Sequence, residues 1–187
     1  MAEPDTIVML RRAAPDTADI DRPGLSFRRE PELGIAKLHL WGSKADARFR
    51  EFVGIAAPRV GTAIEHQGLS FAWLAPAEWL VTGPEAAVAA WVAGTMAAGA
   101  DDLLAIDYSH ARAAFTVAGT NVRAALAAHC PLDLWPDAFP VGAVARSLFG
   151  DTGLFIARLA DAEGAPRFRI IVDQTMAAYA ARLFARA

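Results

Sequence analysis

The sequence predicts one α+β domain built from two similar halves. Short apolar runs bounded by glycine, proline or polar residues predict strands, and they alternate with segments whose apolar residues recur at helical spacing. The order strand, helix, three strands, helix occurs twice, first from Gly34 and again from Arg112, which indicates an internal duplication. The 187 residues, of which 55% are hydrophobic, suffice for one sizeable core.

The first half is expected over residues 34–100. It opens with a strand at 34–42, which is followed by a helix with Ser43 as its N-cap and Gly54 as its end. Pro84 opens a second helix, because a proline in the first helical turn loses no hydrogen bond. Between the two helices, three short strands are predicted near residue 60, at 69–74 and at 79–82.

The second half is expected over residues 103–187. Strands at 103–108 and 113–117 are joined by a tight link. Gly119 and Thr120 then cap a helix that runs to His129 and stops before Pro131. After a loop, three strands are predicted at 144–149, 154–159 and 168–172, and a last helix at 175–184.

Residues 1–31 precede the domain, which is expected over residues 32–187. They are rich in proline, aspartate and arginine and show no sustained period, so they predict an extended N-terminal arm. Two interpretations stay open. The arm either wraps a partner and becomes ordered on binding, or it is a loose tail.

Composition and charge exclude several classes of function. The net charge of -3 argues against non-specific binding to nucleic acid, and no apolar run approaches the roughly 20 residues of a membrane span. The N-terminus lacks the pattern of a secretory signal, and a single cysteine, Cys130, agrees with a reducing compartment, so a cytoplasmic location is expected. The mean hydropathy of +0.27 predicts either an alanine-rich core or a surface that a partner covers.

No catalytic, cofactor-binding or metal-binding residues are predicted. The chain has no phosphate-binding loop, no glycine-rich dinucleotide fingerprint, no HExxH, no GxSxG and no CxxC. The four histidines lie on separate predicted elements, which argues against a metal site. Cys130 precedes a proline at a helix end and is interpreted as a small buried apolar group rather than a nucleophile.

The most polar compact group in the sequence consists of Asp107, Tyr108, Ser109, His110 and Arg112. Such a group could serve acid–base chemistry or carboxylate recognition. However, neighbouring residues of a strand point to opposite faces, so these side chains cannot all converge. We favour a structural interpretation, in which Asp107 and Ser109 bind turn N–H groups and Arg112 pairs with a carboxylate, and partner contact by Asp107, His110 and Arg112 stays open.

Trp135 lies in a loop between two prolines, Pro131 and Pro140. A large exposed ring at such a place would mark a binding surface. Contact with a partner and packing within the loop are both open.

Five motifs, in this order, resemble the gamma subunit of heterotetrameric sarcosine oxidase. They are LAPAEWLV at 74–81, DYSHARA at 107–113, CPLDL at 130–134, FPVG at 139–142 with Arg146, and FRIIV at 168–172. The pair CPLDL and FPVG is the most specific. Tyr108 and Ser147 depart from the pattern, which has a smaller aliphatic residue and a threonine there.

The resemblance implies a fold like the folate-binding domain of the glycine-cleavage aminomethyltransferase, in which strands are exchanged between two halves. It also implies a non-catalytic structural subunit. In such a complex the other subunits, named alpha, beta and delta, convert sarcosine and oxygen to glycine, hydrogen peroxide and a one-carbon unit that tetrahydrofolate captures. The flavins FAD and FMN, NAD, zinc and the folate are expected on those subunits, and none of them on this chain. The N-terminal arm and the apolar surface of this chain would lie mainly against alpha.

Two alternatives remain. One is a stand-alone folate-binding or aminomethyltransferase-like protein, although a fold alone does not establish an activity. The other is a related complex that oxidises a different N-methyl amine.

Overall fold

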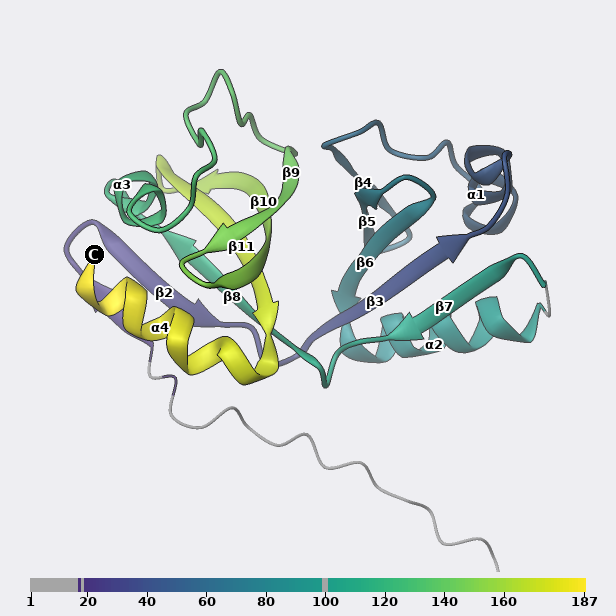
Figure 1. Ribbon diagram of the computed structural model, residues 1–187, viewed down its shortest axis with the longest axis horizontal. Helices are drawn as coiled ribbons and strands as arrows, with labels where there is room; N and C mark the ends of the chain where they lie inside the picture. The colour runs from purple at the N-terminus through teal and green to yellow at the C-terminus, as the bar shows by residue number, and fades with distance from the viewer. Residues whose placement is uncertain (1–16, 18, 99–100) are drawn as a thin grey trace, which may run out of the picture.

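Two antiparallel β-sheets face each other, and the helices lie on their outer sides (Figure 1). The computed structural model describes residues 17, 19–98 and 101–187. Its mixture of antiparallel sheets and short helices confirms the predicted α+β class.

The six-stranded sheet carries the end of the chain. In spatial order its strands are β1 (Ile20–Arg22), β2 (Leu25–Arg29), β8 (Arg112–Ala118), β11 (Ala165–Asp173), β10 (Thr152–Ala162) and β9 (Val144–Phe149). Its outer face is covered by α3 (Val122–Ala127) and by α4 (Ala177–Arg186), which follows the short helix η1 (Gln174–Met176). Phe27, Phe115 and Phe184 stack in the core between this sheet and α4.

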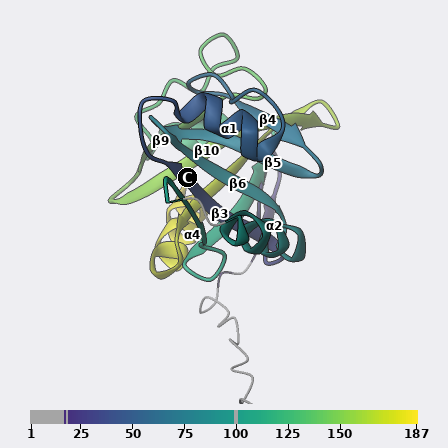
Figure 2. The same cartoon turned by 90° about the vertical axis from the view of Figure 1, so that its right-hand side faces the viewer.

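The five-stranded sheet is formed by the middle of the chain. In spatial order its strands are β4 (Ala63–His66), β5 (Leu69–Ala75), β6 (Glu78–Pro84), β3 (Leu33–Leu40) and β7 (Leu103–Asp107). Figure 2 shows α1 (Ala45–Val53) and α2 (Glu85–Ala97) in front of this sheet. Phe49 of α1 and Val88 of α2 are fully buried against it.

Alternation along the strands decides which side chains face the other sheet. In β3, Leu38 and Leu40 point outward to the helices, whereas Ile35 belongs to the cluster between the sheets. Lys37, two residues after Ile35, therefore also faces inward. The buried residues of the cluster between the sheets are Ile35, Ala72, Leu80, Ala114, Val144, Phe155 and Ile171.

The chain crosses between the two sheets at two places. β2 precedes β3 in sequence but pairs with β8, and β7 precedes β8 but pairs with β3. Each sheet thus contains a strand whose sequence neighbour lies in the other sheet. This pairing is the one that an exchange of strands between two halves would produce, and the exchange itself stays a prediction about how the halves are related.

Most predicted strands agree with the structure. Those predicted at 69–74, 79–82, 103–108, 113–117 and 144–149 correspond to β5, β6, β7, β8 and β9, and the strand predicted at 34–42 corresponds to β3. The strand expected near residue 60 begins later, as β4, after an isolated bridge between Thr62 and Ala143.

The N-caps of α1 and α3 were predicted wrongly. The residue before α1 is Lys44, and the residue before α3 is Asn121, and neither makes a side-chain capping bond. Ser43 is therefore not the N-cap, and α3 is shorter than predicted, ending at Ala127. The end of α1 is as expected, because Gly54 takes the left-handed conformation that closes the helix.

The N-terminal arm also differs from its prediction where the structure describes it. Residues 20–29 form the hairpin β1–β2, which extends the six-stranded sheet rather than standing apart from the domain. Phe27 is 1% exposed because it packs against Phe115 of β8. Residues 1–16 and 18 of the predicted arm lie outside the described residues.

Candidate functional site

The link between β7 and β8 is held by the polar residues that the sequence singled out. The Asp107 carboxylate accepts a hydrogen bond from the Ser109 N–H at 2.8 Å. The Ser109 hydroxyl accepts the N–H of Ile35 at 2.9 Å, and the Ser109 residue is 1% exposed. These bonds tie the crossing between the two sheets to β3, and Ser109 binds the N–H of a strand rather than the turn N–H that was expected.

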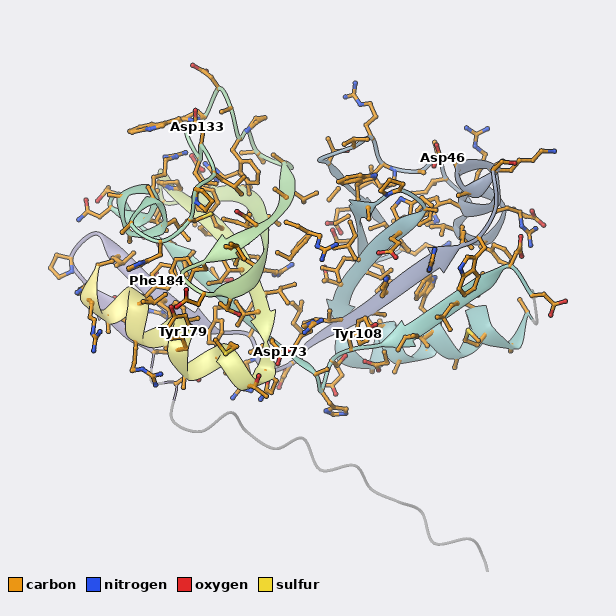
Figure 3. All side chains as sticks on the ribbon, in the orientation of Figure 1. Asp46, Tyr108, Asp133, Asp173, Tyr179 and Phe184 are labelled. Carbon is orange, nitrogen blue, oxygen red and sulfur yellow. The ribbon has the colours of Figure 1, made fainter. Side chains whose placement is uncertain are left out.

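Arg112 and Tyr108 lie at the junction of the two sheets. Arg112 Nη1 donates to Asp173 Oδ2 at 2.7 Å, and its guanidinium lies 5.5 Å from the centre of the Tyr108 ring. Hydrogen bonds from Thr175 and the nearby Arg112 hold the pKa of Asp173 below its ordinary value. Figure 3 shows Tyr108 and Asp173 where the two halves meet. His110 is exposed, so the five polar residues do not converge on one point.

A cleft of about 360 Å³ opens at this junction, between the inner faces of the two sheets. Lys37, Arg112 and Arg146 contribute cations to its walls, and Glu78 and Asp173 contribute carboxylates. Lys37 pairs with Glu78 at 2.8 Å. Sequence reasoning did not find this cleft, because its walls come from strands that are distant in sequence.

The loop between α3 and β9 presents Trp135 to solvent on a fixed backbone. Its side chain is 68% exposed, so packing within the loop leaves most of the ring uncovered. The Asp133 carboxylate accepts the Trp135 N–H at 3.0 Å, and Arg123 Nε donates to the Leu134 carbonyl at 2.9 Å. Figure 3 shows Asp133 on this loop, beyond the end of the sheet.

Two further exposed apolar residues lie on the two loops that reach this side of the molecule. Val60 is 73% exposed, and Val141 of the FPVG motif is 58% exposed. The bridge between Thr62 and Ala143 holds the two loops together. In Figure 1 both loops lie on the same side, at the top. Sequence reasoning missed Val60, because a single apolar residue in a loop carries no signal of its own.

The described residues offer no metal site, since none of their histidine, cysteine, aspartate and glutamate side chains gather in groups of three or more. Cys130 is buried, and its thiol lies 3.8 Å from the Ser147 hydroxyl. In the part of the chain that the structure describes, no helix is long and apolar enough to cross a membrane.

The solved structures that share this fold include a chain of a sarcosine oxidase and an aminomethyltransferase. The heterotetrameric sarcosine oxidase from Corynebacterium sp. U-96, in complex with pyrrole 2-carboxylate, contains a chain that superposes with a TM-score of 0.75 and 20% identity, over 90% of this chain and 85% of that one. The glycine cleavage system aminomethyltransferase T from Bartonella henselae superposes with a TM-score of 0.64 and 15% identity, over 87% of this chain and 46% of that one. These likenesses define a protein with the fold of the aminomethyltransferase folate-binding domain, as predicted.

The family follows from the sequence itself. The chain belongs to the sarcosine oxidase, gamma subunit family, whose sequence model matches residues 42–185. A search of curated proteins gave no match. The resemblance carried by the five sequence motifs is thereby confirmed.

Proposed function

We propose that this chain is the non-catalytic gamma subunit of a heterotetrameric sarcosine oxidase and that it contacts its partners through the loops around Trp135. Its membership of the gamma subunit family carries the first part of this proposal. The exposed Trp135, whose backbone N–H is bound by the Asp133 carboxylate, carries the second. Tryptophan is among the side chains that contribute most to protein interfaces when a partner buries them.

The proposed contact surface consists of Trp135, Val60 and Val141. All three are more than half exposed. Hydrogen bonds within the chain hold the backbone of their loops, through the Thr62–Ala143 bridge and the bond from the Trp135 N–H to Asp133. Because little conformational freedom would be lost on binding, such a surface favours association. Asp107 and Arg112 make their bonds within the chain at the sheet junction instead, and partner contact stays a proposal for the exposed His110.

The chemistry of the complex lies on the other subunits in this proposal. They oxidise sarcosine to glycine with oxygen, form hydrogen peroxide and pass a one-carbon unit to tetrahydrofolate. FAD, FMN, NAD, zinc and the folate are held by the alpha, beta and delta subunits, and this chain binds mainly alpha, in the cytoplasm.

Co-expression with the candidate alpha, beta and delta chains, followed by an affinity pull-down on this chain, tests the proposal. Recovery of the other subunits in equal amounts is expected, and recovery of this chain alone would contradict it. The Trp135→Ala variant should reduce recovery at least tenfold, because loss of a central interface tryptophan costs about 2 kcal/mol or more. Trp41→Ala is the matched control, since Trp41 is 46% exposed but lies at the end of β3.

A second candidate is a stand-alone folate-binding or aminomethyltransferase-like protein. The fold likeness to aminomethyltransferase T and the cleft between the sheets favour it. However, this chain spans only 46% of that chain. Calorimetric titration with tetrahydrofolate decides the matter, and the absence of heat at millimolar ligand would remove this candidate.

A further inference from the structure

We propose that the cleft between the two sheets binds a small organic carboxylate with a flat apolar body, and that the Arg146 guanidinium pairs with the carboxylate. This inference does not depend on the subunit role proposed above. It follows from the charges, the walls and the open space of the cleft.

The charges of the cleft leave one cation unmatched. Lys37 pairs with Glu78 at 2.8 Å, and Arg112 pairs with Asp173 at 2.7 Å. The Arg146 side chain makes no hydrogen bond, ion pair or ring contact with any residue that the structure describes, although its backbone pairs with β10. A guanidinium presents a planar set of donors that matches the two oxygens of a carboxylate, so a monoanion is the ligand that completes this site.

The walls of the cleft suit an apolar body beside that charge. Leu74 and Leu80 line it from the five-stranded sheet, and Phe155 lines it from the six-stranded sheet. Tyr108 adds an aromatic ring whose hydroxyl has no hydrogen-bond partner among the described residues. A volume of about 360 Å³ lies within the range of small-molecule sites in proteins.

Gly153 leaves room for such a ligand. It lies in β10 two residues before the inward-facing Phe155, so it faces the cleft, and it also lines it. A Cβ atom built there meets no atom within 4 Å, and its backbone does not adopt the left-handed conformation that requires glycine. A glycine inside a strand often marks a place where a ligand approaches the backbone closely.

Titration calorimetry with 2-naphthoate tests this inference on the full chain and on the complex assembled by co-expression. Saturable binding is expected in both, and the neutral isostere 2-naphthalenemethanol should bind at least about tenfold more weakly, because it cannot form the charged hydrogen bonds.

Two substitutions with matched controls locate the site. Arg146→Gln should weaken naphthoate binding at least about tenfold without changing the melting temperature, since the guanidinium holds nothing in the described structure. Gly153→Leu should abolish binding by filling the open space. Arg50→Gln changes an exposed arginine of α1, and Gly94→Leu changes a glycine of α2 with equally open surroundings, so both should bind naphthoate like the unaltered chain.

Several results would overturn the inference. They are the absence of saturable binding at 10 mM probe, equal affinity for the alcohol, and unchanged affinity in both cleft variants. Binding to the chain alone that disappears in the complex would also overturn it, because a partner would then fill the cleft. The pull-down described above is a separate readout, so failure of the subunit role and failure of this site are distinguishable.

Discussion

Replacing Ser109 by alanine should destabilise the protein through one buried backbone group. The Ser109 hydroxyl accepts the N–H of Ile35 at 2.9 Å, and the residue is 1% exposed, so water cannot replace the lost partner. An unsatisfied buried donor costs about 1–3 kcal/mol. For a domain of this size each kcal/mol lowers the melting temperature by about 2–4 °C, so Ser109→Ala should lower it by about 2–12 °C.

Thermal unfolding followed by circular dichroism measures this shift, and urea unfolding gives the free energy directly. Ser43→Ala is the matched control, because no side-chain capping bond forms at the start of α1 and an exposed serine there should change stability by less than about 0.5 kcal/mol. Equal melting temperatures for the two variants would refute the account of the β7–β8 link as a buried tie to β3.

Three further predictions concern the packing and the charges, and all are measured by urea unfolding. Gly119→Ala places a Cβ atom 2.2 Å from the Gly24 carbonyl oxygen at a φ of +123°, so it should cost more than the about 1–2 kcal/mol that a left-handed conformation alone costs. Gly142→Ala, at a φ of +85° in open space, should stay within that range, and equal losses would contradict the predicted overlap. Phe155→Ala should cost about 3–5 kcal/mol by opening a cavity between the sheets, and a loss below 1 kcal/mol would show that this cluster does not join them. The folded pKa of Asp173 lies below its ordinary value, so its ionised form contributes stability that is full above about pH 4 and is lost as the pH falls through the folded pKa. Asp173→Asn should therefore lower the free energy of unfolding at pH 7, and the variant should lose less stability than the unaltered chain between pH 5 and pH 2. Equal losses of stability in the two proteins over that range would contradict the prediction.

The strands with their own local signal could be predicted from the sequence, and those without one could not. The strand around Ile35 shows alternation between flanking glycines, and it lies where expected. The hairpin at 20–29 was missed because its stability comes from β8, which lies about ninety residues further along the chain. Phe27 alone in a proline- and arginine-rich segment gives no sign of the two rings, Phe115 and Phe184, that bury it.

The same limit applies to the functional surfaces. Trp135 stood out because tryptophan between two prolines in a loop is unusual, and the structure places it on the surface. Arg146 entered only as part of a motif, and Gly153 not at all. Their importance depends on the approach of two sheets, and no pattern within a single strand reports how far apart two sheets lie.

The most direct test of the subunit role is native mass spectrometry of the complex obtained by co-expression, combined with hydrogen–deuterium exchange of this chain alone and in the complex. The account predicts one assembly that contains this chain together with the alpha, beta and delta chains, in which backbone exchange of residues 131–143 slows when the partners bind. An assembly of the other three chains that excludes this one, or an exchange rate of that loop that does not change, would contradict it.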